Sequence, residues 1–202
     1  MKSVSINFMR GICLMLITSL TMVSCNESGR GNDSNVNEDG NEATVESNDD
    51  KFAGKKQRDA DFVYDLVESS YGEIKLAELG NQKSRTPEVK RIAQMLLMDH
   101  TASLNELKTI AQAKAISIPV EEGSDSKRRL ENLAQESVDE FDQTWVEVMM
   151  GLHEENIREF ESRLEDTGDA ELKAFINKTI PVLKKHHQSL EGFNEKIIKA
   201  AR

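Results

Sequence analysis

The stretch TPEVKRIAQMLLMDHTASLNELKTIA, residues 86–111, decides the fold class of this chain. Thr86-Pro87-Glu88 is typical of a helix start, with a capping residue, a proline at the first helical position and an acid in the first turn. The positions that should face inward are apolar at helical spacing except for one histidine: Val89, Ile92, Ala93, Leu96, His100, Leu104, Leu107 and Ala111. This period predicts an amphipathic helix that runs to about residue 114, with one polar side chain on its buried face.

The rest of the domain repeats the helical period. We expect three more helices over residues 58–84, 127–166 and 169–200, with a loop at 118–125. Four helices of roughly 25 to 40 residues favour an all-α, up-down-up-down four-helix bundle, in which the first and last turns lie at the same end. Pro181 lies inside the last helix and is expected to kink or break it.

One polar residue interrupts the apolar face of each helix near its middle. These residues are Glu73, His100, His153 and His186. Counted from the turns they lie roughly 18 to 27 Å along the bundle, so all four should point inward at a similar level. A carboxylate and three imidazoles in an apolar interior would suit a transition metal such as Zn, Fe or Cu. The alternative is an internally satisfied polar network, with His100 paired to Glu73.

Three further residues near this set could contribute to a metal site. Asp99 and His187 adjoin two of the histidines and could hydrogen-bond the ligands, although the helix turns them about 100° away, which equally suits exposed residues. Met149 lies one turn before His153 and could be a soft ligand for Cu(I), whereas filling of core gaps is the alternative. The chain contains no nucleophile motif or phosphate-binding loop, so we assign no catalytic residue.

The start of the chain has the pattern of an export signal. In residues 1–24, Lys2 and Arg10 precede an apolar run that is too short to cross a bilayer, which is typical of a signal peptide. The sequence MVSC at residues 22–25 resembles the lipobox of bacterial lipoproteins, whose cysteine is lipidated. Lipidation of Cys25 would anchor the chain to a membrane. No aspartate follows the cysteine, which favours the outer membrane, facing the periplasm.

Residues 25–57 are strongly acidic and poor in apolar side chains, so we expect a disordered tether. An EF-hand-like pattern within it consists of Asn35, Asn37, Asp39, Gly40 and Glu46. No helical pattern flanks it, so a solvated run is favoured over a calcium site. The whole chain has 36 acidic and 26 basic residues, a net charge of −10, which argues against a nucleic-acid partner. The sequence identifies no protein partner and leaves a homo-oligomer open.

Several motifs resemble the bacterial domain of unknown function family 4142. They are Gly72-Glu73-Ile74, VKRIAQM at residues 89–95 with Asp99-His100-Thr101, Phe141-Asp142 through Trp145 to His153, and Pro181-Val182-Leu183 to His186. The resemblance covers residues 58–200 and implies an exported protein with a ferritin-like four-helix bundle. It also implies that the residues shared by the family fall on the four polar positions above and on Asp99.

Ferritin chemistry does not follow from this resemblance. A di-iron centre requires Glu-x-x-His motifs, whereas Leu97, Met150 and Leu183 stand three residues before the three histidines. Our first hypothesis is a membrane-tethered periplasmic bundle, residues 58–202, that binds a transition metal for metal handling or stress protection. The second is a non-enzymatic envelope binding or scaffold module with a structural polar core. An enzyme at the same site would need an open coordination position, which a sequence does not show.

Overall fold

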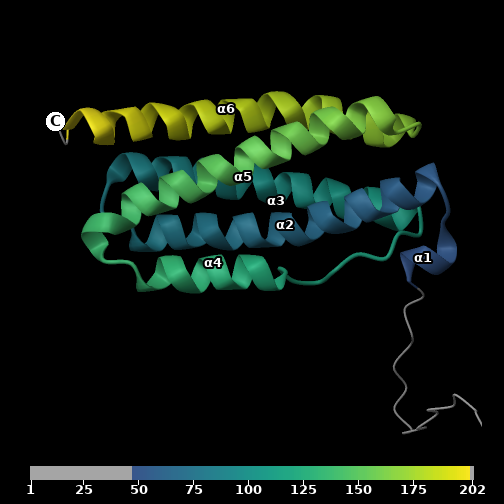
Figure 1. Cartoon of the computed structure of the whole chain (residues 1–202), viewed down its shortest axis with the longest axis horizontal. Helices are drawn as coiled ribbons and strands as arrows, with labels where there is room; N and C mark the ends of the chain where they lie inside the picture. The colour runs from purple at the N-terminus through teal and green to yellow at the C-terminus, as the bar shows by residue number, and fades with distance from the viewer. Residues whose placement is uncertain (1–46, 201–202) are drawn as a thin grey trace, which may run out of the picture. The chain divides into compact units, whose positions relative to one another are not determined.

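The structure is a computed structural model that describes residues 47–200 (Figure 1). Every regular element within this range is a helix: α1 (Asn48–Lys51), α2 (Lys55–Lys83), α3 (Pro87–Ala113), α4 (Ser124–Gln135), α5 (Val138–Asp166) and α6 (Ala170–Ala200). The all-α class and the four long helices are therefore confirmed. Among these described helices, none has both the length and the hydropathy that a membrane span requires.

The four long helices form a ring in which each packs against two neighbours, in the order α2, α3, α6, α5. Ion pairs at the ends of the bundle fix the directions. Lys196 near the end of α6 binds Glu88 at the start of α3, and Arg58 at the start of α2 binds Asp166 at the end of α5. Neighbouring helices are therefore antiparallel, while α3 and α5 run in the same direction. The order is up-down-down-up, which corrects the up-down-up-down expectation.

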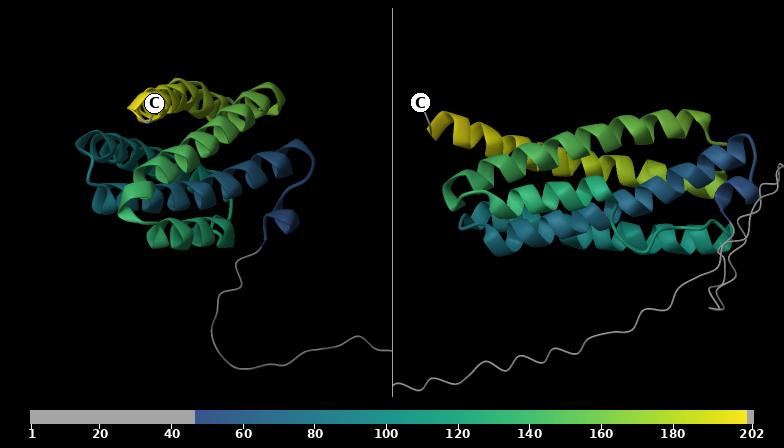
Figure 2. Two further views of the ribbon diagram at one scale, coloured as in Figure 1. Left: turned by 60° about the vertical axis from the view of Figure 1, so that its left-hand side comes forward. Right: turned by 60° about the horizontal axis from the view of Figure 1, so that its bottom comes forward.

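The connection between α3 and α5 explains this difference. After α3 the chain returns along α2 through a loop and α4, so α5 starts at the end of the bundle where α3 also starts (Figures 1 and 2). A single long crossover of this kind is the connection found in ferritin-like bundles. The turns at 84–86 and 167–169 consequently lie at opposite ends. The four polar residues still lie at a similar level of the bundle. Each stands near the middle of its helix, and reversing the direction of a helix leaves its middle in place.

The expected helix over residues 127–166 is in fact two helices, because a tertiary contact stabilises the end of α4 and a local cap starts α5. Ser137 caps α5: its hydroxyl accepts a hydrogen bond from the Glu140 N–H and donates one to the Glu140 carboxylate. Lys83 of α2 binds the carbonyl oxygens at the end of α4, at 2.6 to 3.1 Å from Leu133, Ala134 and Glu136.

The start of the helical domain also differs from the expectation. Within the segment predicted as a disordered tether, residues 25–57, the structure has α1 and the first turn of α2. The Asn48 side chain fixes α1, because its amide donates to the carbonyl of Ser117 at 2.9 Å and its oxygen accepts from the N–H of the same residue at 2.8 Å. The predicted boundary at residue 58 is therefore too late. The signal peptide, Cys25 and the EF-hand-like pattern lie outside the described residues.

Pro181 does not break the last helix. Helix α6 runs without interruption from Ala170 to Ala200, with Pro181 inside it. A proline removes the hydrogen bond to the carbonyl four residues earlier, here that of Asn177. Both residues are exposed, so water can serve the carbonyl that loses its donor.

The apolar interior of the bundle consists of two clusters. One is built from the start of α2, the end of α3, the end of α5 and the start of α6. The other is built from the opposite halves of the same four helices together with Leu133 of α4. Between the two lies a layer of buried polar residues: Ser70, Glu73, His100, His153, Asn156 and His186. The interruption of each apolar face thus places the candidate site in the middle of the bundle.

A glycine allows a close contact between α2 and α5. The indole of Trp145 is fully buried and its N–H donates to the carbonyl of Leu76 at 2.8 Å. A Cβ atom at Gly80 would lie 2.5 Å from the indole ring, closer than such atoms approach in proteins. Glycine at this position therefore lets the large ring pack directly against the backbone of α2.

Candidate metal centre

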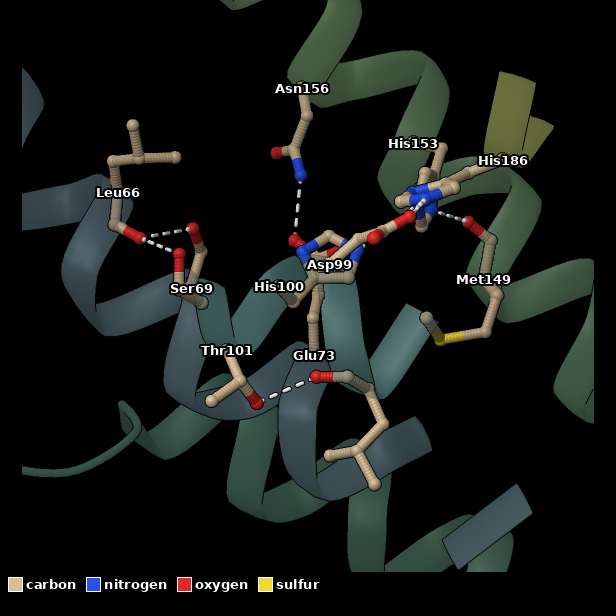
Figure 3. A network of polar contacts seen from close by, with 12 residues as sticks. Leu66, Ser69, Glu73, Asp99, His100, Thr101, Met149, His153, Asn156 and His186 are labelled. Carbon is tan, nitrogen blue, oxygen red and sulfur yellow. Dashed lines mark hydrogen bonds and ion pairs between the residues drawn. The ribbon is translucent and has the colours of Figure 1, made fainter. Parts of the chain in front are cut away.

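Three imidazoles from three helices meet in the polar layer: His100 on α3, His153 on α5 and His186 on α6 (Figure 3). The His153 Nε2 atom lies 3.3 Å from Nε2 of His100 and 3.3 Å from Nδ1 of His186. The ring centroids are 5.3 to 5.4 Å apart. One nitrogen of each ring thus points toward a common centre, with all three within 4.8 Å of one another.

The outward-facing nitrogens of two rings have acceptors that fix their tautomers. His153 Nδ1 lies 2.8 Å from the carbonyl oxygen of Met149, one turn earlier in α5. His186 Nε2 lies 2.8 Å from the carboxylate of Asp99. A carbonyl and a carboxylate accept hydrogen bonds, so each of these nitrogens carries the hydrogen of a neutral ring. The central nitrogens of His153 and His186 therefore present lone pairs.

Burial keeps these rings neutral. The exposed fractions of His100, His153 and His186 are 6%, 0% and 1%. Removal from water lowers the pKa of all three imidazoles below the ordinary value of 6.5, and this effect outweighs the opposing attraction of the nearby carboxylates. At neutral pH the rings are thus in the form that can bind a metal ion.

The three rings have more acceptor nitrogens at the centre than hydrogens to satisfy them. The lone pairs of His153 Nε2 and His186 Nδ1 face each other at 3.3 Å in a buried space, with no hydrogen between them. His100 Nε2 can donate one hydrogen, which satisfies at most one of them. A cation at the centre would satisfy all three nitrogens together. Nitrogen ligands about 2.0 to 2.1 Å from a tetrahedral Zn²⁺ lie about 3.3 to 3.4 Å from one another, which matches the two separations from His153 Nε2, while the third pair lies within 4.8 Å.

Glu73 on α2 adds a negative charge beside the histidines. Its Oε1 accepts a hydrogen bond from Asn156 Nδ2 at 2.7 Å. Its Oε2 lies 3.4 Å from His100 Nε2 and 3.8 Å from His153 Nδ1, is buried, and has no hydrogen-bond partner. The set of mutually close ligand atoms nevertheless contains only the three imidazoles. The structure thus places Glu73 against the cluster but outside the set of atoms that converge on its centre.

Of the three further candidates, Asp99 and Met149 contact the histidine cluster and His187 does not. Asp99 binds His186 directly, while His187 lies away from the cluster and pairs with Glu154 at 3.1 Å. Met149 contributes its backbone carbonyl to His153, whereas its side chain packs in an apolar cluster and its sulfur points away from the imidazoles (Figure 3). Sequence reasoning missed Asn156, which holds Glu73. Its position one turn after His153 on the same face of α5 was the signal that could have identified it.

Comparisons with known proteins agree with the resemblance in the sequence motifs. The chain matches the family described as a domain of unknown function (DUF4142) over residues 44–192, which contain all three histidines and both carboxylates that contact them. No curated protein and no solved structure matches the chain. Because the match covers most of the sequence, the chain belongs to the DUF4142 family.

Proposed function

We propose that this chain binds one transition-metal ion through His100 Nε2, His153 Nε2 and His186 Nδ1. The observation that carries the proposal is the pair of buried lone pairs that face each other at 3.3 Å. A purely structural network would place a hydrogen between each pair of close polar atoms, because buried acceptors without donors are costly. A metal ion removes this cost and explains why the hydrogens of two rings point outward.

The ligand chemistry favours zinc, copper or iron. Neutral imidazole nitrogen is an intermediate ligand that suits these ions, whereas calcium and magnesium prefer oxygen ligands. The carboxylates of Glu73 and Asp99 would offset the charge of the ion in an otherwise apolar interior. Asp99 has the further role of orienting His186, as carboxylates commonly do for metal-bound histidines.

The cellular role that we propose is metal handling or stress protection by a bundle tethered to a membrane. This part of the proposal comes from the signal-like residues 1–24 and from Cys25. Lipidation of that cysteine would place the chain in the bacterial envelope, with the outer membrane as the favoured site. Mass spectrometry of the chain from bacterial membranes tests this point, since a diacylglyceryl group on Cys25 is the expected modification.

Metal content of the purified full chain tests the central proposal. We expect one equivalent of Zn²⁺ or Co²⁺ per chain after loading and dialysis, and loss of this ion in His153→Asn. His187→Asn is the matched control, because this ring pairs with Glu154 outside the cluster and its replacement should retain the ion. Circular dichroism checks that each variant remains helical.

The scaffold hypothesis makes the opposite prediction. In that case the polar layer only specifies helix register, so His100→Ala lowers the stability of the chain while metal content stays unchanged. A wild-type chain that retains no ion above trace after exposure to zinc, copper and iron would refute the metal proposal.

A further inference from the structure

A small cavity adjoins the histidine cluster on the side of Glu73. Its volume is about 20 Å³, which is room for one water molecule. Its walls include His100 and His186 from the cluster, Glu73 with its supporting residue Asn156, and the small polar residues Ser103 and Thr179. The partnerless Oε2 of Glu73 belongs to this group of residues. The cavity therefore has the size of a single small ligand, and its walls offer polar groups beside the apolar side chains of Leu66, Phe160, Val182 and Leu183.

A second, larger cavity adjoins this space on the side of the surface. Its volume is about 150 Å³, and it lies between α3 and α6. The two cavities share four lining residues, which are Asp99, Ser103, Thr179 and Val182. The outer part is lined by Glu106 and Lys178, whose side chains are 38% and 69% exposed and form an ion pair at 2.6 Å. The seam between α3 and α6 is thus the side on which a solvent-facing cavity comes nearest to the small cavity beside the cluster.

We propose that the ion held by the three histidines keeps one coordination position for water or another small exogenous ligand, whose donor atom lies in the small cavity. Glu73 accepts a hydrogen bond from this ligand, and the seam between α3 and α6 is its entrance. The inference rests on the proposed metal site. Three protein ligands and one exchangeable ligand distinguish reactive zinc sites from structural ones, which use four protein ligands. The centre would thus bind small molecules, beyond holding an ion.

The position of Glu73 favours this role over direct ligation. In a tetrahedral site every pair of ligand atoms is about 3.3 Å apart. Glu73 Oε2 lies at about this distance from His100 Nε2, at 3.4 Å, but the nitrogen of His153 nearest to it is Nδ1, at 3.8 Å, and this atom faces away from the common centre toward the Met149 carbonyl. Asn156 holds the other carboxylate oxygen at 2.7 Å. The carboxylate is thus held beside the metal ligands, where a water bound to the ion can donate a hydrogen bond to Oε2.

Cobalt substitution offers a direct test, because the visible spectrum of Co²⁺ changes when an exogenous ligand binds. We expect azide to change the spectrum of the Co²⁺-loaded full chain in a saturable titration. Glu73→Gln should retain cobalt and bind azide about tenfold more tightly or better, because the substitution removes a negative charge beside the anion. A carboxylate that lay far from the open position would not change the binding of an anion when its charge is removed.

A larger side chain at Ser103, which lines both cavities, tests the entrance. Ser103→Leu places a larger side chain where the two cavities meet, so azide binding followed by stopped flow should slow by about tenfold or more, or disappear. The matched control is Ser162→Leu, at an exposed position of α5 that lines neither cavity, and it should bind azide at the wild-type rate.

The possible results separate this inference from the proposed function. A chain that takes up no cobalt refutes both. A chain that holds cobalt but gives no azide response in the wild type and in Glu73→Gln retains the metal site and refutes the open position. Loss of cobalt in Glu73→Gln identifies the carboxylate as a ligand and overturns its assignment as an acceptor. Equal azide rates in Ser103→Leu and the wild type overturn the entrance.

Discussion

Removal of the charge that orients His186 should weaken metal binding by a measurable amount. In Asp99→Asn an oxygen acceptor can remain near His186 Nε2, now 2.8 Å from Oδ2, but its negative charge is lost. Loss of such partners commonly costs 10- to 100-fold in metal affinity, about 1.4 to 2.7 kcal/mol. The Asp99 side chain is 41% exposed, so solvent already screens part of its charge. We therefore expect the lower end, about a tenfold loss of affinity.

Competition with a fluorescent zinc chelator near neutral pH measures this change. The matched control is Glu154→Gln, because Glu154 forms the same kind of pair with His187 at 3.1 Å, away from the cluster. The control should bind zinc with wild-type affinity. If Asp99→Asn also binds zinc as the wild type does, or if both variants weaken binding equally, the assignment of Asp99 to the metal centre is wrong.

Three further predictions concern stability. Burial lowers the pKa of His153 and the two other central imidazoles, so the unfolded chain gains protons near pH 6.5 that the folded chain does not; urea titrations of the metal-free chain should show full stability above pH 6.5 and a decline below it. In thermal melts, Gly80→Ala should destabilise by about 1 to 3 kcal/mol through its clash with Trp145, whereas Gly151→Ala, which meets nothing, should stabilise by about 0.5 to 1 kcal/mol. Lys83→Met should lower the free energy of unfolding by about 1 kcal/mol and speed amide exchange in α4, because it removes the donor at the end of that helix; unchanged exchange would contradict this role.

The sequence predicted the histidine cluster because a buried polar residue interrupts a regular apolar pattern. His100, His153 and His186 stand at positions where the period requires an apolar side chain, and the structure brings all three together. Glu73 followed the same pattern, yet the pattern could not distinguish a ligand from a neighbour. That distinction depends on atomic separations and on Asn156, whose amide fixes the carboxylate.

The sequence did not predict the directions of the helices correctly, because the break between α4 and α5 was hidden in a continuous helical pattern. The N-cap residue Ser137 divides the expected third helix, but Ser137 also fits the inward positions of a continuous helix. Without that break, no crossover segment is available and an up-down-up-down order is the simplest solution. Tertiary contacts such as those of Lys83 with the end of α4 decide between the two arrangements.

The three imidazoles come from separate helices and are 53 and 33 residues apart along the chain. No short peptide of this protein contains the triad, so an unfolded chain offers an ion only isolated side chains and binds it weakly. If the chain binds an ion as proposed, capture of that ion would report that folding is complete. A chain exported before it folds would acquire its ion from the compartment it reaches, so that the supply of metals there, rather than in the cytosol, would determine which ion it carries.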